Sequence, residues 1–183
     1  MALRHLSQHG HRKIAFIKGQ EFSSDTEVRW NAIMDAANRL EIPVSPKLTA
    51  QLEGDASSPQ LGYRVTKSIL DSRERFTALF AFNDIAAIGA IRALREAQLR
   101  VPEDISVIGF EDTQSAPYLN PGLTTVKQPL GKMGKIAAET VLERIRRPGS
   151  NSIAESITVE PELVVREATG PAAEIPRRLG RMS

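Results

Sequence analysis

The sequence contains no cysteine among its 183 residues, so neither disulfide bonds nor thiolate metal sites can contribute to its structure. It has no run of 18 apolar residues and no leader in which basic residues precede an apolar stretch, which predicts a cytoplasmic protein without a membrane partner. Charge of one sign is not in excess either, because 24 Lys and Arg stand against 22 Asp and Glu. The sequence therefore lacks the large excess of basic residues that would indicate nucleic-acid binding.

Motifs of several common enzyme classes are also absent. The sequence has no GxSxG nucleophile elbow, no phosphate-binding P-loop, no GxGxxG after a strand and no HExxH zinc motif. Paired acids at two strand ends could serve phosphoryl or proton chemistry, but no motif places a Lys, Ser or His to act with them. We therefore expect no enzyme activity, no catalytic residues and no cofactor.

The central part of the sequence predicts a strand, a helix and a second strand. Residues 77–82 and 105–109 are continuous apolar runs, typical of parallel strands covered on both faces, and residues 85–97 are rich in the Ala and Ile of a buried helix. Parallel strands joined by a helix have their carboxyl ends side by side, where open α/β sheets bind ligands. Asn83 and Glu111 follow the two strands, so we expect them to face one crevice.

The same alternation of strands and helices extends along most of the chain. Further strands are expected at residues 14–17, 48–52, 123–126, 156–159 and 162–166, and helices at 1–8, 60–72 and 133–146. Another helix, which Asp25 or Thr26 could cap, is expected to end before Pro43. The alternation with short connections predicts an α/β fold with a doubly wound parallel sheet.

Polar side chains at the predicted crevice suit a hydroxyl-rich ligand. Asn83 offers a donor and an acceptor, Glu111 accepts from two hydroxyls at once, and Arg29 adds a fixed fork of donors. Each residue also has a simpler interpretation. Asn83 or Asp84 could cap the following helix, Glu111 could lie in a solvated turn, and Arg29 could pair with Asp25 on a helix surface.

Three histidines lie close together near the start of the sequence: His5, His9 and His11. His9 and His11 lie on either side of Gly10, where a left-handed residue is expected to end the first helix. No carboxylate is placed with these histidines, so we predict no metal site.

Several segments, which keep their order and spacing, resemble those of one protein family. They are GHRKIAFIKG, an Arg that opens the next helix, LFAFNDIAAIGAIRALREAQLRVPEDISVIGFEDT, YLNPGLTTVKQPLGKMGKIAAE and PELVVRE. Together they resemble the effector-binding half of the lactose-repressor (LacI/GalR) family of bacterial transcription regulators. Members of that family are similar to type I periplasmic sugar-binding proteins: two α/β lobes close over a small ligand, and a helix-turn-helix headpiece binds the operator.

The resemblance implies an organisation for the chain. Residues 1–169 would form the effector-binding domain, with residues 13–113 and 153–168 in the carboxy-terminal lobe and residues 122–147 crossing to the other lobe. We expect the headpiece and most of the amino-terminal lobe to be absent, so DNA would be bound only through a headpiece outside this chain. Residues 170–183 are expected to be a disordered basic tail.

The resemblance also implies which residues bind the effector. Positions matching Arg29, Asn83 and Glu111 contact the effector in the family, and we add Asp25, which lies one helical turn from Arg29. The ligand would be a sugar, sugar phosphate, polyol or nucleoside. The family most often has Asp at the position of Glu111, and the aromatic residue that often stacks on a sugar is not evident after residues 54–55.

A homodimer is expected as well, because positions matching Ile88 and Tyr118 lie in the family's dimer contact. If the amino-terminal lobe is absent, the strand around Val126 and the helix after it would have no sheet to join and would expose apolar surface.

Two functions are compatible with these observations. The first is the ligand-sensing and dimerising module of a repressor, in which ligand binding biases the orientation of two lobes. The alternative is a stand-alone small-molecule binding protein with no role on DNA. A helix-turn-helix encoded upstream of residue 1 would distinguish the first from the second.

Overall fold

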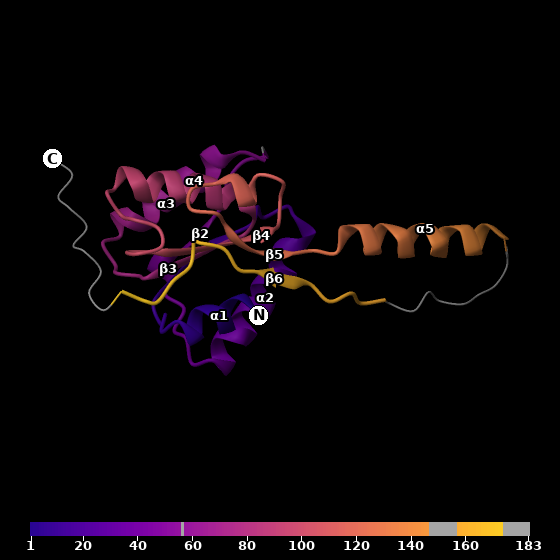
Figure 1. Ribbon diagram of the computed structural model, residues 1–183, viewed down its shortest axis with the longest axis horizontal. Helices are drawn as coiled ribbons and strands as arrows, with labels where there is room; N and C mark the ends of the chain where they lie inside the picture. The colour runs from indigo at the N-terminus through magenta and orange to yellow at the C-terminus, as the bar shows by residue number, and fades with distance from the viewer. Residues whose placement is uncertain (56, 147–156, 174–183) are drawn as a thin grey trace.

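The computed structural model describes residues 1–55, 57–146 and 157–173, and its strands form one six-stranded sheet (Figure 1). The strands are β1 (Ile14–Lys18), β2 (Thr49–Gln51), β3 (Ala78–Ala81), β4 (Ser106–Glu111), β5 (Thr124–Lys127) and β6 (Glu162–Val164). Their order in the sheet is β2-β1-β3-β4-β5-β6, and the first five are parallel. The predicted α/β class and parallel sheet are confirmed, although β6 pairs antiparallel with β5.

Helices cover both faces of the sheet. Helices α3 (Pro59–Asp71) and α4 (Asp84–Glu96) lie on one face, and α1 (Ala2–Gln8) and α2 (Ser24–Arg39) lie on the other (Figure 1). Single turns of 3-10 helix occur at Pro46–Leu48 and Ala116–Tyr118. No helix within the described residues is both long and apolar enough to cross a membrane.

Alternate residues of the central strands pack into two separate cores. Leu79 belongs to the cluster on the α3 and α4 side, whereas its neighbour Phe80 belongs to the cluster on the α1 and α2 side. Val107 and Ile108 on β4 divide in the same way. The continuous apolar runs in the sequence are thus explained, because side chains on both faces of these strands are buried.

Two glycines allow α3 and α4 to pack in direct backbone contact. A Cβ atom at Gly89 of α4 would overlap the carbonyl oxygen of Pro59, and one at Gly62 of α3 would overlap that of Ala86. The contact fixes the position of α4, and therefore of Asn83, which immediately precedes this helix.

Helix α5 (Leu130–Arg146) differs from the other helices, because it projects from the body and has no buried residue (Figure 1). The strand that precedes it is part of the sheet, with β4 on one side and β6 on the other, and Val126 is 3% exposed. The expectation that this strand would have no sheet to join is therefore wrong. For the helix, however, the expected apolar exposure is present. The exposed large apolar side chains of α5 are Leu130, Met133, Val141, Leu142 and Ile145.

The predicted cap of α2 and the predicted strand at residues 156–159 need correction. Helix α2 begins at Ser24 after Ser23, so neither Asp25 nor Thr26 is its cap; the Thr26 hydroxyl instead donates to the Gln20 carbonyl oxygen at 2.7 Å. Residues 157–159 form no strand, and residue 156 of that predicted strand lies outside the described residues.

The start of the expected disordered tail is also bound to the body. The Gly170 nitrogen donates to Ser106 Oγ at 3.0 Å, and the Ala172 nitrogen donates to the His9 carbonyl oxygen at 2.8 Å. Residues 170–173 are therefore part of the folded body, and residues 174–183 lie outside the described part.

Candidate functional site

Arg29 reaches from α2 to the carboxyl end of β3. Its Nη1 donates to the Phe82 carbonyl oxygen at 2.6 Å, and its guanidinium carbon lies 4.2 Å and 3.9 Å from the ring centres of Phe82 and Phe110. Its Nη2 is 3.8 Å from Asp25 Oδ2. Burial lowers the pKa of Arg29, while the negative charges of Asp25 and Glu111 act in the opposite direction. The guanidinium is thus in contact with two aromatic rings at the predicted crevice.

Asn83 lies at the end of β3 and caps α4. Its Oδ1 accepts a hydrogen bond from the Ala86 nitrogen at 2.8 Å. The simpler interpretation of Asn83 as a helix cap is therefore correct. This bond engages only the side-chain oxygen, and Asn83 itself is partly exposed beside the Phe82 carbonyl that binds Arg29.

Glu111 ends β4 in an unusual backbone conformation. Its φ is 115°, and that of the following Asp112 is 56°, both in the region that residues with side chains seldom adopt. Burial raises the pKa of Glu111, the negative charge of Asp84 raises it further, and Arg29 lowers it. Two consecutive strained residues with a half-buried carboxyl group indicate that this turn has a function besides chain reversal.

Asp84 holds this turn in place through hydrogen bonds. The sequence did not indicate this role. It is completely buried, its Oδ1 accepts from the Thr125 hydroxyl at 2.6 Å, and its Oδ2 accepts from the Thr113 nitrogen at 2.7 Å. Burial raises its pKa, against the effect of these hydrogen bonds. Gly109 leaves space for the carboxylate, because a Cβ atom there would overlap Asp84 Oδ1. Asp84 therefore connects α4, β5 and the turn after β4.

Asp112, next to Glu111, is neutralised by Lys127 at the end of β5 and by Arg166, which follows β6. Asp112 Oδ1 accepts from Arg166 Nη2 at 2.7 Å, and Lys127 Nζ lies 3.9 Å from Asp112 Oδ2. These cations are therefore engaged with Asp112, whereas the cation that influences Glu111 is Arg29.

A hollow of about 300 Å³ lies at the same edge of the sheet, beyond β1 and β2. It is lined by residues 20–22 from the loop after β1 and by residues 51–54 from the end of β2 and the loop that follows. Phe22 is 72% exposed there.

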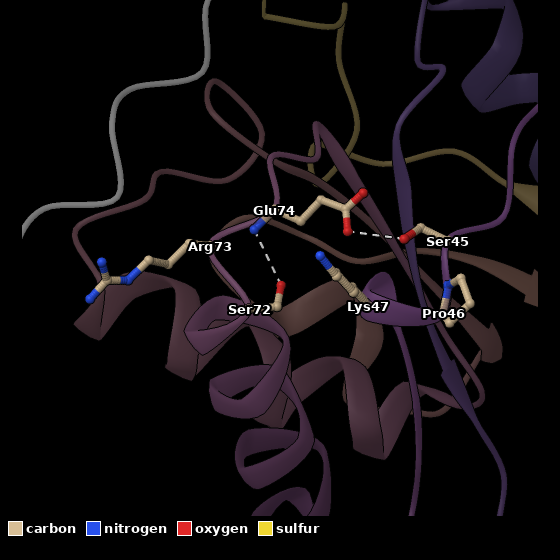
Figure 2. Close-up of a pocket in the computed structure, with 6 residues that line it drawn as sticks. All are labelled: Ser45, Pro46, Lys47, Ser72, Arg73 and Glu74. Atoms are coloured by element: carbon tan, nitrogen blue, oxygen red, sulfur yellow. Dashed lines mark hydrogen bonds between the residues drawn. The ribbon is translucent and has the colours of Figure 1, made fainter.

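A second hollow, of about 470 Å³, lies at the amino ends of β2 and β3. It is lined by Ser45, Pro46, Lys47, Ser72, Arg73 and Glu74 (Figure 2). Figure 2 shows the Glu74 carboxylate facing Ser45, whose Oγ donates to Glu74 Oε2 at 3.0 Å, while Arg73 points away from the other side chains. This hollow is at the opposite edge from Arg29 and Glu111 and is therefore not part of the predicted effector site.

The histidines serve the packing of the chain ends. His11 is buried, with Nε2 3.0 Å from the Gly170 carbonyl oxygen and Nδ1 2.9 Å from Thr77 Oγ1. His5 Nε2 lies 3.0 Å from Thr169 Oγ1. Across residues 1–55, 57–146 and 157–173, no three His, Cys, Asp or Glu side chains are grouped so that they could hold a metal ion.

The two residues of the predicted dimer contact differ in exposure. Tyr118, at the end of a 3-10 turn, is 88% exposed, whereas Ile88 on α4 is partly buried. Both leave apolar surface accessible, and their role in a dimer stays a prediction.

Phe82 and Phe110 are site residues that the sequence interpretation missed. Each directly precedes a predicted polar residue, Asn83 and Glu111 respectively, so the repeated Phe before a strand-end polar residue was the available signal.

Comparisons with known proteins show the family to which the chain belongs. Residues 3–169 match the family model described as periplasmic binding protein-like domain. The HTH-type transcriptional repressor PurR of Yersinia pestis is 39% identical over 173 residues, which cover 93% of this chain and 49% of that protein. The ribose operon repressor of Haemophilus influenzae is 34% identical over 168 residues, which cover 92% and 49%. The chain thus spans about half the length of these curated relatives.

The chain is also similar to solved structures of LacI-family proteins. A LacI-family transcriptional regulator from Enterococcus faecium with bound ribose is 32% identical, with a TM-score of 0.78 over 93% of this chain and 61% of that one. The lac repressor dimer bound to operator and the anti-inducer ONPF is 30% identical, with a TM-score of 0.83 over 92% and 56%.

Proposed function

This chain belongs to the periplasmic binding protein-like domain family, in the form found in LacI-family repressors, and from this membership we propose that it is the ligand-sensing, dimerising part of a transcriptional repressor. Ligand binding would change the relative orientation of two lobes and so the DNA affinity of a headpiece outside this chain. Such a repressor would act in the cytoplasm. A stand-alone binding protein has less support, because the curated relatives are repressors.

The observation that carries the proposal is the convergence of Arg29 and Glu111 at the carboxyl ends of β3 and β4. Their charges influence each other, although they come from different elements. Glu111 would accept hydrogen bonds from ligand hydroxyls, and Asn83 and Asp25 would complete the polar rim. The related Enterococcus faecium regulator was crystallised with ribose, so a sugar-like effector is the first class to test.

We further propose that residues 13–113 form most of one lobe and that α5 belongs to the second lobe. The exposed apolar side chains of α5 support this assignment, because a helix with such a face is stable only when another element covers it. Dimerisation would involve Ile88 and Tyr118, and Tyr118→Asp should shift the molecular mass in solution toward that of a monomer.

Thermal unfolding of this chain with sugars, polyols and nucleosides tests ligand sensing directly. A ligand that binds only the folded state raises the unfolding temperature, and at 100 times its Kd it adds about 2.7 kcal/mol of stability. We expect a shift with at least one ligand, its loss in Glu111→Ala and its retention in Glu160→Ala, an exposed control outside the site. If Glu111→Ala kept the shift, the proposed site would be wrong. If no ligand produced a shift in a chain that unfolds cooperatively, binding would require the second lobe.

A further inference from the structure

Strand β2 forms one edge of the sheet and leaves backbone groups open on its outer side. In the sheet that the described residues form, β2 comes first in the order and pairs with β1 alone. The Leu52 nitrogen donates to the Lys18 carbonyl oxygen, so alternate residues face β1, and the backbone groups of Thr49 and Gln51 face outward. Residues 49–51 are all partly exposed. Their outward N–H and C=O groups can therefore pair with another strand.

The composition of β2 does not oppose such pairing. The strand, Thr49–Gln51, contains neither a charged residue nor a proline, the two kinds of residue that commonly prevent an edge strand from pairing with another chain. The strand at the opposite edge, β6, contains Glu162. Because β2 has only three residues, a contact along it would be small and would need further interactions at its ends.

A hollow lies at each end of β2, and the two hollows differ in charge. The hollow shown in Figure 2, which we call the amino-end hollow, contains Lys47 and Arg73. Both are exposed, and neither side chain has a hydrogen bond or ion pair within the described residues, whereas the Glu74 carboxylate beside them accepts from a serine hydroxyl. The hollow past Gln51, which we call the carboxyl-end hollow, contains the exposed Glu21 and Glu53 and is lined by no Lys or Arg. One end of β2 thus offers unpaired cations and the other unpaired carboxylates.

Antiparallel pairing of two β2 strands would bring the unlike hollows together. A two-fold axis reverses one copy relative to the other, so the amino-end hollow of each lies beside the carboxyl-end hollow of the other. With the axis at Ala50, Thr49 of one copy exchanges N–H···O bonds with Gln51 of the second copy. The small Ala50 side chains then meet at the axis, where opposite residues approach most closely. Lys47 and Glu53 each lie three residues from Ala50, so the same register brings Lys47 of one copy to Glu53 of the second.

We propose that β2 is a second self-association surface, on which two copies of this chain pair their β2 strands antiparallel into one continuous sheet. Backbone hydrogen bonds form the centre of the contact, and ion pairs between the unlike hollows form its two ends. The surface is separate from the proposed dimer contact, because Ile88 lies on α4 and not at this edge. Two different two-fold contacts on one chain join dimers into larger assemblies.

A charge swap tests the pairing of the hollows. Sedimentation velocity of the whole chain, with Tyr118→Asp in every sample to weaken the other contact, should show dimers that depend on protein concentration and decrease as salt is raised. Lys47→Glu should raise the dimer dissociation constant at least about tenfold, because carboxylates would then face each other, and Glu53→Lys should do the same. The double variant Lys47→Glu/Glu53→Lys should restore pairing, because the exchanged charges attract again. Arg4→Glu, at an exposed residue of α1, is the control for charge and should have little effect.

The absence of cysteine from the sequence allows a direct test of the register. Ala50→Cys places one thiol in each copy, and opposite residues of a non-hydrogen-bonded pair are close enough for a disulfide. Mild oxidation should link most of this variant into dimers on a non-reducing gel. Glu103→Cys, at an exposed residue between α4 and β4, should remain largely unlinked.

Three results would each overturn the inference. They are a double charge variant that does not restore pairing, equal cross-linking of the two cysteine variants, and a Tyr118→Asp chain that is monomeric at every concentration. None of these measurements involves a ligand, so the proposed ligand sensing would stand in each case.

Discussion

Helices α4 and α5 carry apolar side chains on more than one side, yet only one of them is covered. Helix α4 has eight buried residues and packs against both α3 and the sheet, whereas α5 has none and projects from the body (Figure 1). The apolar pattern of a helix thus indicates that a partner surface is needed without saying which surface provides it. In α4 the partner is in this chain, and for α5 we propose the second lobe.

The difference between the two helices predicts where substitutions affect stability. A contact that exists in this chain contributes to its free energy of unfolding, and an exposed helix contributes little beyond its own helical propensity. Paired substitutions, one in each helix, measure this difference directly.

The largest effect is expected for glycine substitutions. Gly89→Val should reduce the free energy of unfolding by about 4 kcal/mol or more, because its side chain would overlap the backbone of α3 at Pro59 and Tyr63. Gly134→Val in α5 has open space around it and should change stability by less than about 0.5 kcal/mol. Urea unfolding followed by circular dichroism measures both, and equal effects would show that α5 is packed in solution.

A smaller but still clear difference is expected for leucine truncation. Leu94→Ala removes a completely buried side chain from α4 and should cost about 3 kcal/mol, within the usual range of about 2–5. Leu142→Ala removes a half-exposed side chain from α5 and should be nearly neutral. A large loss for Leu142→Ala in a monomeric sample would contradict the exposure of α5.

Much of the fold could be predicted from the sequence because it depends on local patterns. The apolar runs of residues 77–82 and 105–109 contain β3 and most of β4, and Gly10 has the expected left-handed backbone with φ of 86°. The antiparallel direction of β6 could not be predicted, because strand direction depends on the path of the chain after α5 and not on alternation.

The site was only partly predictable, for a similar reason. Sequence position and sheet topology brought Asn83 and Glu111 to one edge, but they did not reveal that Phe82 and Phe110 enclose Arg29. The sequence offered Asp84 as a helix cap or as one of the acids at the strand ends, but not as a buried support for the turn, since its partner Thr125 lies 41 residues away in the sequence. Contacts between distant segments decide how these side chains are used, and no local pattern encodes such contacts.

A third difference between the body and α5 concerns pH, because all three histidines lie in the body. The Gly170 carbonyl can only accept, so His11 donates to it from Nε2 and, when neutral, accepts from the Thr77 hydroxyl at Nδ1. Burial lowers the pKa of His11, and the nearby His9 and His5 lower it further. Burial and His9 lower the pKa of His5 as well.

These shifts predict that acid weakens the body. Because the pKa of His11 is lower in the folded than in the unfolded chain, the unfolded chain binds more protons, and stability is lost as pH falls below the unfolded value of about 6.5. Urea unfolding at pH 7, 6 and 5, followed by the fluorescence of Trp30 on α2, should show this loss, with a smaller effect than either packing variant. His11→Gln should reduce the pH dependence, and His9→Gln, at a residue that is not buried, should retain more of it. A pH dependence of stability that was the same in His11→Gln as in the unmodified chain would contradict this role of His11.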